Sequence, residues 1–315
     1  MFYSLISNRS ALLSYVLTLL TLVLSAWFSW DVNLDVNTLL LNNQLFHIVS
    51  QQFVILSIAF YVNWLLLKHK LMPLGDYSLL FMIAVSLCGL GYNIESMRVL
   101  LALSFSAMMI GKVKSLFNQQ ESIFIEFEVG LLAGLSFLAH PVFVFVLPLA
   151  LIAVLLAKAN DWRDYMAVLL GYSFLIFLKA CYYVWTDQWT SIPRIIALVF
   201  QAKSFQNIGG IQVIGLLIYG FIALVAINYN RKISDKLNIK DRIYYKLWLS
   251  YYFFMLLPFL FLSNGLSITQ LALTSLLPLL VLLQSYFHKK KKWYWNDGLV
   301  AFLVIFCVLV HVFPS

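Results

Sequence analysis

Two carboxylates near the beginning of the chain stand at a spacing that permits chemistry. Asp31 and Asp35 follow a long apolar segment directly and lie four residues apart. On a helix, residues at this spacing project from the same side. Such a pair could hold a divalent cation, the only cofactor that the sequence suggests, or Asp35 could take the proton of an acceptor hydroxyl as a general base. The alternative is a pair of ordinary solvated loop carboxylates.

A second polar group surrounds Arg98. Glu95 and Arg98 are three residues apart in a short polar stretch between two apolar segments. They could form an ion pair at the start of a helix. Alternatively, the planar guanidinium of Arg98 has the geometry to bind a phosphate group, with Glu95 beside it.

A histidine stands at an interruption of another apolar stretch. His140 is followed by Pro141, so it could be no more than the last residue of a helix. Because imidazole titrates near neutral pH, His140 could instead serve as a general base.

The remaining candidates are mostly basic. Lys179 lies inside an apolar segment, where a lysine is expected to extend its ammonium toward the head groups or to pair with Asp187. A contact with a lipid phosphate is the alternative. Arg194 and Lys203 follow in the next polar segment and could add positive charge to a phosphate site.

The composition indicates what kind of molecule positions these residues. Hydrophobic residues make up 63% of the 315 positions and charged residues only 11%, whereas soluble domains are about a quarter charged. One water-soluble core of this size cannot hold this number of apolar side chains. Lipid must therefore surround much of the chain. We therefore predict one integral membrane domain over residues 1–315. The net charge of +8 is interpreted as basic cytoplasmic loops and not as nucleic-acid binding.

Eleven apolar segments predict an all-α polytopic bundle of 10–11 transmembrane spans. The segments are Ala11–Trp30, Val49–Leu67, Tyr77–Tyr92, Met97–Ile110, Phe124–Leu138, Val142–Ala157, Tyr165–Val184, Ile211–Ala226, Leu247–Leu262, Ser267–Phe287 and Gly298–Val312. The orientation of every later loop depends on whether residues 124–157 form one span or two, divided at residues 140 and 141. A single helix from Phe124 to Ala157 would be about 51 Å long, far more than a hydrocarbon core of about 30 Å, and proline interrupts the helical hydrogen-bond ladder.

The basic residues orient this bundle. With the N-terminus in the cytoplasm and the C-terminus outside, all but four of the 21 Lys and Arg residues fall in cytoplasmic segments, as the positive-inside rule requires. The four exceptions are Arg98, Lys179, Arg194 and Lys203. Residues 229–246 form the most basic cytoplasmic loop. Two amphipathic segments, near 34–49 and 192–205, are expected to lie as helices in the outer interface. Glu121, Glu126 and Glu128 are expected at a helix entry on the inner side.

Missing sequence motifs argue against several kinds of protein, beginning with ATP-driven transporters, which need a Walker motif. The sequence contains no Walker motif, no G-x-S-x-G, no H-E-x-x-H and no C-x-x-C. Its three cysteines are far apart and lack metal-ligand spacing. We expect no metal site built by histidine and cysteine.

The stretch from Tyr92 to Ile152 carries a resemblance to a known family. It opens with Tyr92-Asn-Ile-Glu-Ser-Met-Arg98-Val-Leu-Leu-Ala102 and later contains Leu131-Leu-Ala-Gly-Leu-Ser-Phe-Leu-Ala-His140. This pattern resembles the EpsG and Wzy-type polysaccharide polymerases of bacterial envelopes, in which an arginine starts an Ala- and Leu-rich helix and a histidine ends a later one. The layout also looks like the GT-C type of membrane glycosyltransferase.

The resemblance implies an enzyme of the bacterial inner membrane that polymerises O-antigen, capsule or exopolysaccharide. Its donor would be an oligosaccharide on polyprenyl diphosphate, bound among membrane lipids, and its acceptor a sugar hydroxyl. Arg98 would neutralise the leaving diphosphate, assisted by the other outer basic residues, and His140 or Asp35 would take the acceptor's proton. Two alternatives stay open: a transporter or flippase for a lipid-linked substrate, and a non-catalytic subunit with membrane-protein partners.

Overall fold

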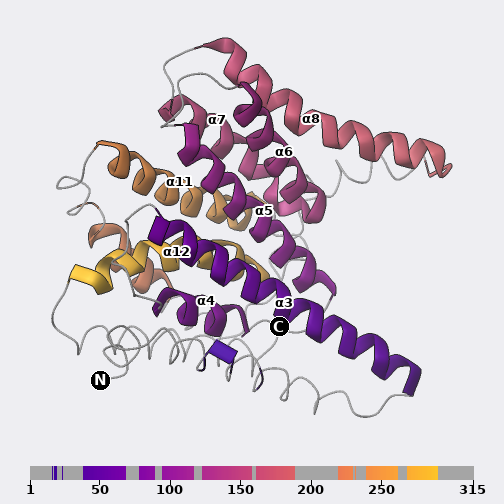
Figure 1. The fold of residues 1–315 in the computed structure, drawn as a ribbon, viewed down its shortest axis with the longest axis horizontal. Coiled ribbons are helices and arrows are strands. Elements are labelled where there is room, and N and C mark those ends of the chain that lie inside the picture. The colour runs from indigo at the N-terminus through magenta and orange to yellow at the C-terminus, as the bar shows by residue number, and fades with distance from the viewer. Residues whose placement is uncertain are drawn as a thin grey trace. The chain divides into compact units, whose positions relative to one another are not determined.

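The fold was analysed in a computed structural model, which describes the chain in separate ranges. These are residues 16, 18–19, 23, 38–68, 78–88, 94–116, 123–157, 161–188, 219–229, 231, 239–261 and 268–289. Within these ranges every residue is helical except His140, Asp161 and the three residues after Trp185. The described part of the chain therefore contains no strand, and the predicted all-α class is confirmed there (Figure 1).

The described helices overlap the predicted apolar segments, although two of them begin well before the predicted first residue. They are α3 (Thr38–Lys68), α4 (Ser78–Cys88), α5 (Ile94–Leu116), α6 (Ile123–Ala139), the 3-10 helix η1 (Pro141–Phe145), α7 (Val146–Ala157), α8 (Trp162–Trp185), an unlabelled helix Tyr219–Tyr229, α11 (Ile239–Phe261) and α12 (Ile268–Lys289). The predicted spans Ala11–Trp30 and Gly298–Val312 lie almost wholly outside the described residues.

Three of the described helices are long and apolar enough to cross a membrane. They are Ile48–Lys68 within α3, Met97–Leu116 within α5, and α8 over its whole length. Shorter apolar helices accompany them at Pro141–Ala157, Tyr219–Tyr229 and Thr274–Gln284. The chain thus has the helices of a membrane protein, while the count of eleven spans and the orientation of the termini stay predictions.

The helix α3 differs from its prediction at its beginning. The segment near 34–49 was expected to be a separate interfacial helix, but from Thr38 onward it is continuous with the following span. The 31 residues of α3 measure about 46 Å along the axis, more than a bilayer core of about 30 Å. Part of α3 must therefore extend beyond the core or tilt. The other predicted interfacial segment, 192–205, lies outside the described residues. The basic loop predicted over 229–246 is described in part, and its second part is wrong as a loop, because residues 239–246 are helical and form the beginning of α11.

The division at His140 and Pro141 is confirmed. The helix α6 ends at Ala139, His140 has an extended backbone with φ −150° and ψ 125°, and the chain continues from Pro141 as η1 and then α7. Proline cannot donate the hydrogen bond that would continue α6. The backbone N–H of Phe143 instead donates to the carbonyl of His140 at 3.0 Å.

The chain forms two compact units, and each is assembled from separate segments of the sequence. One unit comprises Met1–Leu100, Asn207–Lys236 and Ser267–Ser315, and the other comprises Leu101–Gln206 and Leu237–Leu266. In the first unit, α4 packs against both α3 and α12, and the hydroxyls of Tyr219 and Ser275 share a hydrogen bond of 2.7 Å. The single membrane domain over residues 1–315 stays a prediction.

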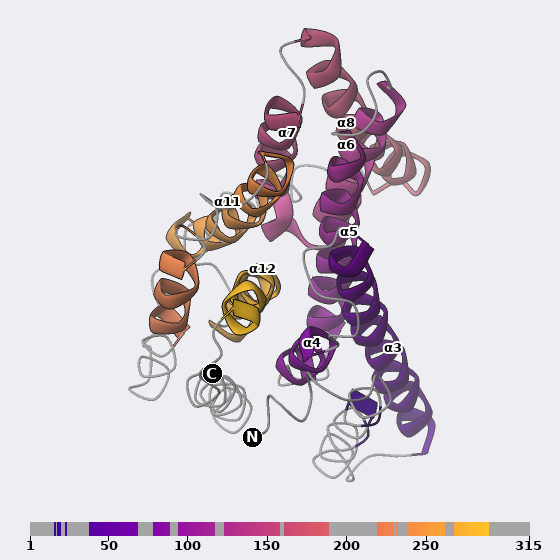
Figure 2. The same ribbon diagram turned by 60° about the vertical axis from the view of Figure 1, so that its left-hand side comes forward.

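The second unit is organised around the pair α6 and α8, which lie side by side (Figures 1 and 2). A Cβ atom added to Gly130 would lie 2.1 Å from the carbonyl oxygen of Val168, and one added to Gly171 would lie 2.3 Å from that of Phe127. The two backbones are therefore in direct contact. Only glycine permits so close an approach, which is a common way for membrane helices to associate. We call this contact the α6–α8 seam.

The start of α8 has a helix cap that positions it for this contact. Asp161 precedes the helix with an extended backbone, and its carboxylate accepts a hydrogen bond from the backbone N–H of Arg163 at 3.3 Å. Aspartate is among the preferred residues at this position because it satisfies an otherwise unpaired helix-end N–H.

Candidate functional site

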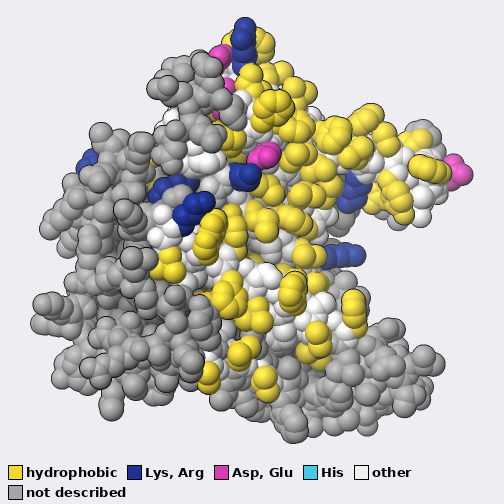
Figure 3. All heavy atoms as spheres, in the orientation of Figure 1, with side chains coloured by type: hydrophobic (Ala, Val, Ile, Leu, Met, Phe, Trp, Pro, Cys, Tyr) yellow, Lys and Arg dark blue, Asp and Glu magenta, His cyan; other side chains and the backbone are white. Residues whose placement is uncertain are grey.

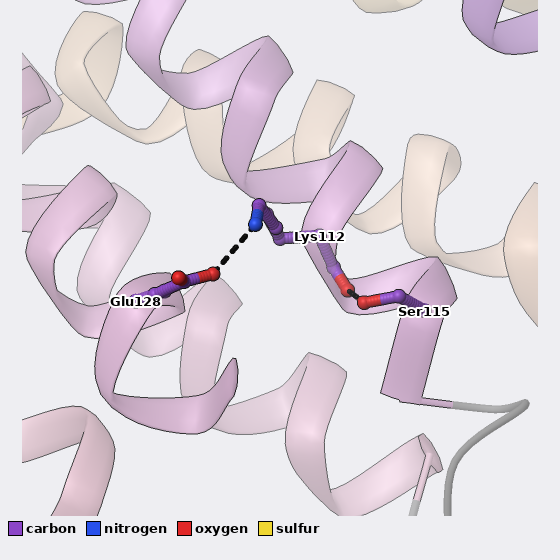
Figure 4. Close-up of polar contacts among 3 residues, drawn as sticks. All are labelled: Lys112, Ser115 and Glu128. Carbon is purple, nitrogen blue, oxygen red and sulfur yellow. Dashed lines mark hydrogen bonds and ion pairs between the residues drawn. The ribbon is translucent and has the colours of Figure 1, made fainter. Parts of the chain in front are cut away.

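A charged pair joins the end of α5 to the beginning of α6. The ammonium of Lys112 lies 2.6 Å from a carboxylate oxygen of Glu128, and both side chains are about half exposed (Figure 4). In the same turn of α5, the Ser115 hydroxyl donates to the carbonyl of Lys112 at 2.6 Å. The predicted topology assigns this end of both helices to the cytoplasmic side, where Glu126 was expected at a helix entry. Glu126 does lie in the first turn of α6.

Next to this pair, three charged residues are buried inside the second unit. Lys114 and Asp164 are 7% exposed, and Glu126 is 0% exposed. The Lys114 ammonium lies 4.5 Å from the centre of the Tyr244 ring, a distance at which the ring stabilises a cation. Ionisable groups are costly inside a membrane protein. This is therefore the most strongly charged part of the described interior.

The register of the seam relates the two buried carboxylates. Gly130 approaches Val168 most closely, and Glu126 and Asp164 each stand four residues earlier on their own helices. Both helices start at this end. Glu126 and Asp164 therefore lie at the same level, one turn before the closest approach. Apart from Glu126, which the sequence analysis placed only at a helix entry, these buried residues were not among the candidates.

A buried aromatic row on α11 extends from the same region. Tyr244, Trp248 and Tyr251 are all fully buried, and successive ring centres are 6.2 and 5.9 Å apart. At the far end of the row, the hydroxyls of Tyr251 and Ser106 share a hydrogen bond of 2.5 Å. The row thus connects α11 to α5 by one cation–ring contact and one hydroxyl pair.

His140 lies at the opposite end of α6 from the buried charges. It is half-buried, and its ring meets the ring of Phe143 edge-on, with the centres 6.4 Å apart. Fourteen residues separate it from Glu126, which is about 21 Å along a helix. The second unit therefore has two distinct polar regions, and the predicted general base belongs to the one without buried charged residues among those described.

Arg98 and its neighbour lie at the beginning of α5. Arg98 is exposed, in the second turn of the helix. Glu95 belongs to the first turn of α5, but its side chain is not among those described. Both residues belong to the first unit and His140 to the second. The predicted acidic pair Asp31 and Asp35, and the predicted phosphate ligands Arg194 and Lys203, lie outside the described residues.

Lys179 and Asp187 lie at the end of α8. The Lys179 ammonium is 5.9 Å from the centre of the Tyr183 ring. Asp187 is exposed and has φ 54°, in the left-handed region in which helices often terminate. Its backbone N–H donates to the carbonyl of Val184 at 3.2 Å. Asp187 therefore ends the helix, whatever further role it has.

The chain was compared with protein-family models, with curated proteins and with solved structures. No match was found in any of the three. Any function must therefore be argued from the residues themselves.

The described residues also bear on metal binding. Among them, no group of three His, Cys, Asp or Glu side chains could hold a metal ion.

The seam and its buried carboxylates were missed by the sequence analysis, although one signal was present. Gly130 and Gly134 form a G-x-x-x-G pattern in an apolar helix, which is typical of close helix contacts in membranes.

Proposed function

We propose that the chain is a polysaccharide polymerase of the bacterial inner membrane. It joins oligosaccharide units carried on polyprenyl diphosphate, on the outer face, by GT-C-like glycosyl transfer. Arg98 binds the diphosphate leaving group and His140 accepts the proton of the acceptor hydroxyl. The observation that carries the proposal is the break at His140, because it presents an imidazole at a helix end instead of on a lipid-facing surface.

The topology predicted from the basic residues assigns Arg98 and His140 to the same, outer side of the membrane. Arg98 stands fourteen residues before Lys112 on α5, and His140 stands twelve residues after Glu128. These separations correspond to about 21 and 18 Å of helix, enough to traverse most of a core of about 30 Å. Each helix is therefore long enough to reach from the predicted cytoplasmic side, where Lys112 and Glu128 are paired, to the predicted outer side.

The proposed chemistry needs few residues. Glycosyl transfer from a diphosphate donor requires stabilisation of the negative charge on the leaving group and removal of one proton from the acceptor. A guanidinium offers paired donors to phosphate oxygens, and an imidazole near neutrality can take a proton and release it again. Arg98 and His140 are therefore of the residue types that these two tasks require.

The test replaces these residues in cells that depend on this chain for their envelope glycan. Arg98→Ala and His140→Ala should each leave the protein at normal abundance but yield single repeat units instead of long chains on a glycan gel. Removing a leaving-group donor of this kind typically lowers a rate by about 10²–10³.

A matched control uses an arginine at the other end of a helix. Arg163 is exposed beside the cap of α8, on the predicted cytoplasmic side, and Arg163→Ala should leave chain length unchanged. Polymer of normal length from Arg98→Ala at normal abundance would rule out the proposal. If the glycan units failed to reach the outer face at all, a flippase would be the better explanation.

A further inference from the structure

The second half of α8 lacks the packing that its first half has. The buried residues of α8 are Asp164, Ala167, Val168, Gly171 and Tyr172. From Ser173 to Trp185 every residue is exposed or half-exposed. The exposed side chains are largely apolar, and Figure 3 shows hydrophobic side chains along the part of the molecule where Figure 1 places α8. We call residues 173–185 the outer half of α8.

The side chains of the outer half fit lipid better than a partner helix. Membrane helices associate through small residues that let backbones approach, as Gly130 and Gly171 do in the seam. The outer half instead presents bulky groups, with Phe177 63% exposed and Tyr182 61% exposed. Such side chains hold another backbone away, whereas flexible acyl chains can fill the spaces between them.

The ends of α8 agree with a helix that crosses the bilayer in contact with lipid. Its 24 residues measure about 36 Å, slightly more than the hydrocarbon core of about 30 Å. Trp162 and Trp185 stand at its two ends and are 67% and 89% exposed. Tryptophan at both ends of a span is typical of the two membrane–water interfaces.

Lys179 brings a positive charge to this lipid-facing surface. It precedes Trp185 by six residues, about 9 Å along the axis, so its extended side chain reaches the head groups. The nearby ring of Tyr183, 5.9 Å from the ammonium, and the exposed Tyr182 belong to the same end.

We infer that the outer half of α8 docks an anionic bilayer phospholipid, whose phosphate charge is not cancelled by a choline as it is in phosphatidylcholine. The lipid's chains lie against Phe174, Phe177 and Leu178, and its phosphate accepts a hydrogen bond from the Lys179 ammonium at the level of the tyrosines. The inference rests on the surface of α8 and not on the polymerase proposal. Hence either can fail without the other.

The experiment measures lipid binding to the full-length chain. The protein is reconstituted in nanodiscs of phosphatidylcholine with a minor fraction of phosphatidylglycerol, and the lipids retained after release are counted by native mass spectrometry. Lys179→Gln should lower the affinity for phosphatidylglycerol about fivefold, which corresponds to about 1 kcal/mol for one lysine near the surface. Lys179→Arg should keep it. Retention of phosphatidylcholine should not change.

Two controls distinguish docking from general charge. Arg163→Gln removes one positive charge from the other end of α8 and should have less effect than Lys179→Gln. Inorganic phosphate at millimolar concentration should not displace the lipid, because it lacks the chains. The inference would be overturned by unchanged phosphatidylglycerol binding in Lys179→Gln, by an equal fall in Arg163→Gln, or by displacement with phosphate alone.

Discussion

The two halves of α8 have the same secondary structure and a similar apolar character, yet they meet different surroundings. The first half contacts α6 so closely that Gly171 has no space for a Cβ atom. The outer half, from Ser173 to Trp185, contains no buried residue. In water, hydrophobicity alone would drive both halves into a core. In lipid it cannot, since acyl chains are as apolar as leucine, and the shape of the side chains decides which half binds another helix.

The largest effect is expected from filling the seam. Gly130→Ala would place a methyl group 2.1 Å from the carbonyl oxygen of Val168, and a backbone atom cannot move aside without separating the helices. We expect the free energy of unfolding to fall by about 3 kcal/mol or more. The measurement is unfolding of the purified protein in mixed micelles titrated with SDS.

The same substitution at another glycine serves as its control. Gly220, in the helix Tyr219–Tyr229, has nothing within 4 Å of an added Cβ. Because alanine favours helix over glycine by about 1 kcal/mol, Gly220→Ala should leave the stability unchanged or raise it. A loss at Gly220 as large as that at Gly130 would mean that the close approach of α6 and α8 does not hold the unit together.

A smaller effect is expected from truncating an aromatic ring on each side of the comparison. Phe137 on α6 is 8% exposed and packs against Tyr172 of α8, with ring centres 5.9 Å apart. Phe177 on the outer half is 63% exposed. Phe137→Ala should therefore cost about 2 kcal/mol of unfolding free energy, because it leaves a cavity between helices. Phe177→Ala should cost almost nothing, since lipid or detergent fills the space.

The paired measurement uses the same titration for both variants. Equal losses would show that the outer half of α8 also packs against protein, either a second copy of the chain or another subunit. That result would contradict the lipid-facing interpretation of α8 and would favour the non-catalytic subunit among the alternative functions.

The sequence predicted the helices of this protein better than their packing. The break at His140 and Pro141 could be predicted because proline lacks the N–H that continues a helix and because a single helix over Phe124–Ala157 would be about 51 Å long. Proline alone would not have sufficed, since Pro258 and Pro278 lie inside α11 and α12. The start of α8 was predicted within a few residues by its apolar run. These features depend on local chemistry, which a single sequence contains.

The packing could not be predicted in the same way. A membrane helix is apolar on every side, so the periodic pattern that reveals the buried face of a soluble helix is absent. For that reason the burial of Lys114 and Asp164 was missed, and Glu126 was noted only as a helix entry. The candidates Arg98 and His140 were selected by residue type and resemblance, and their proposed roles stay predictions.

The smallest effect is expected at the Lys112–Glu128 pair, which tests whether charge or close approach holds α6 in place. The two side chains are 49% and 46% exposed, and exposed ion pairs contribute about 0–1 kcal/mol. Lys112→Gln and Glu128→Gln should each lower the unfolding free energy by about 0.5 kcal/mol, and the double variant should lose no more than their sum. Added salt should reduce the difference from the wild type, because it screens exposed charges. A loss near that of Gly130→Ala would instead assign the stability of this unit to its charged end, and the contrast between the two halves of α8 would then lose its basis in backbone contact.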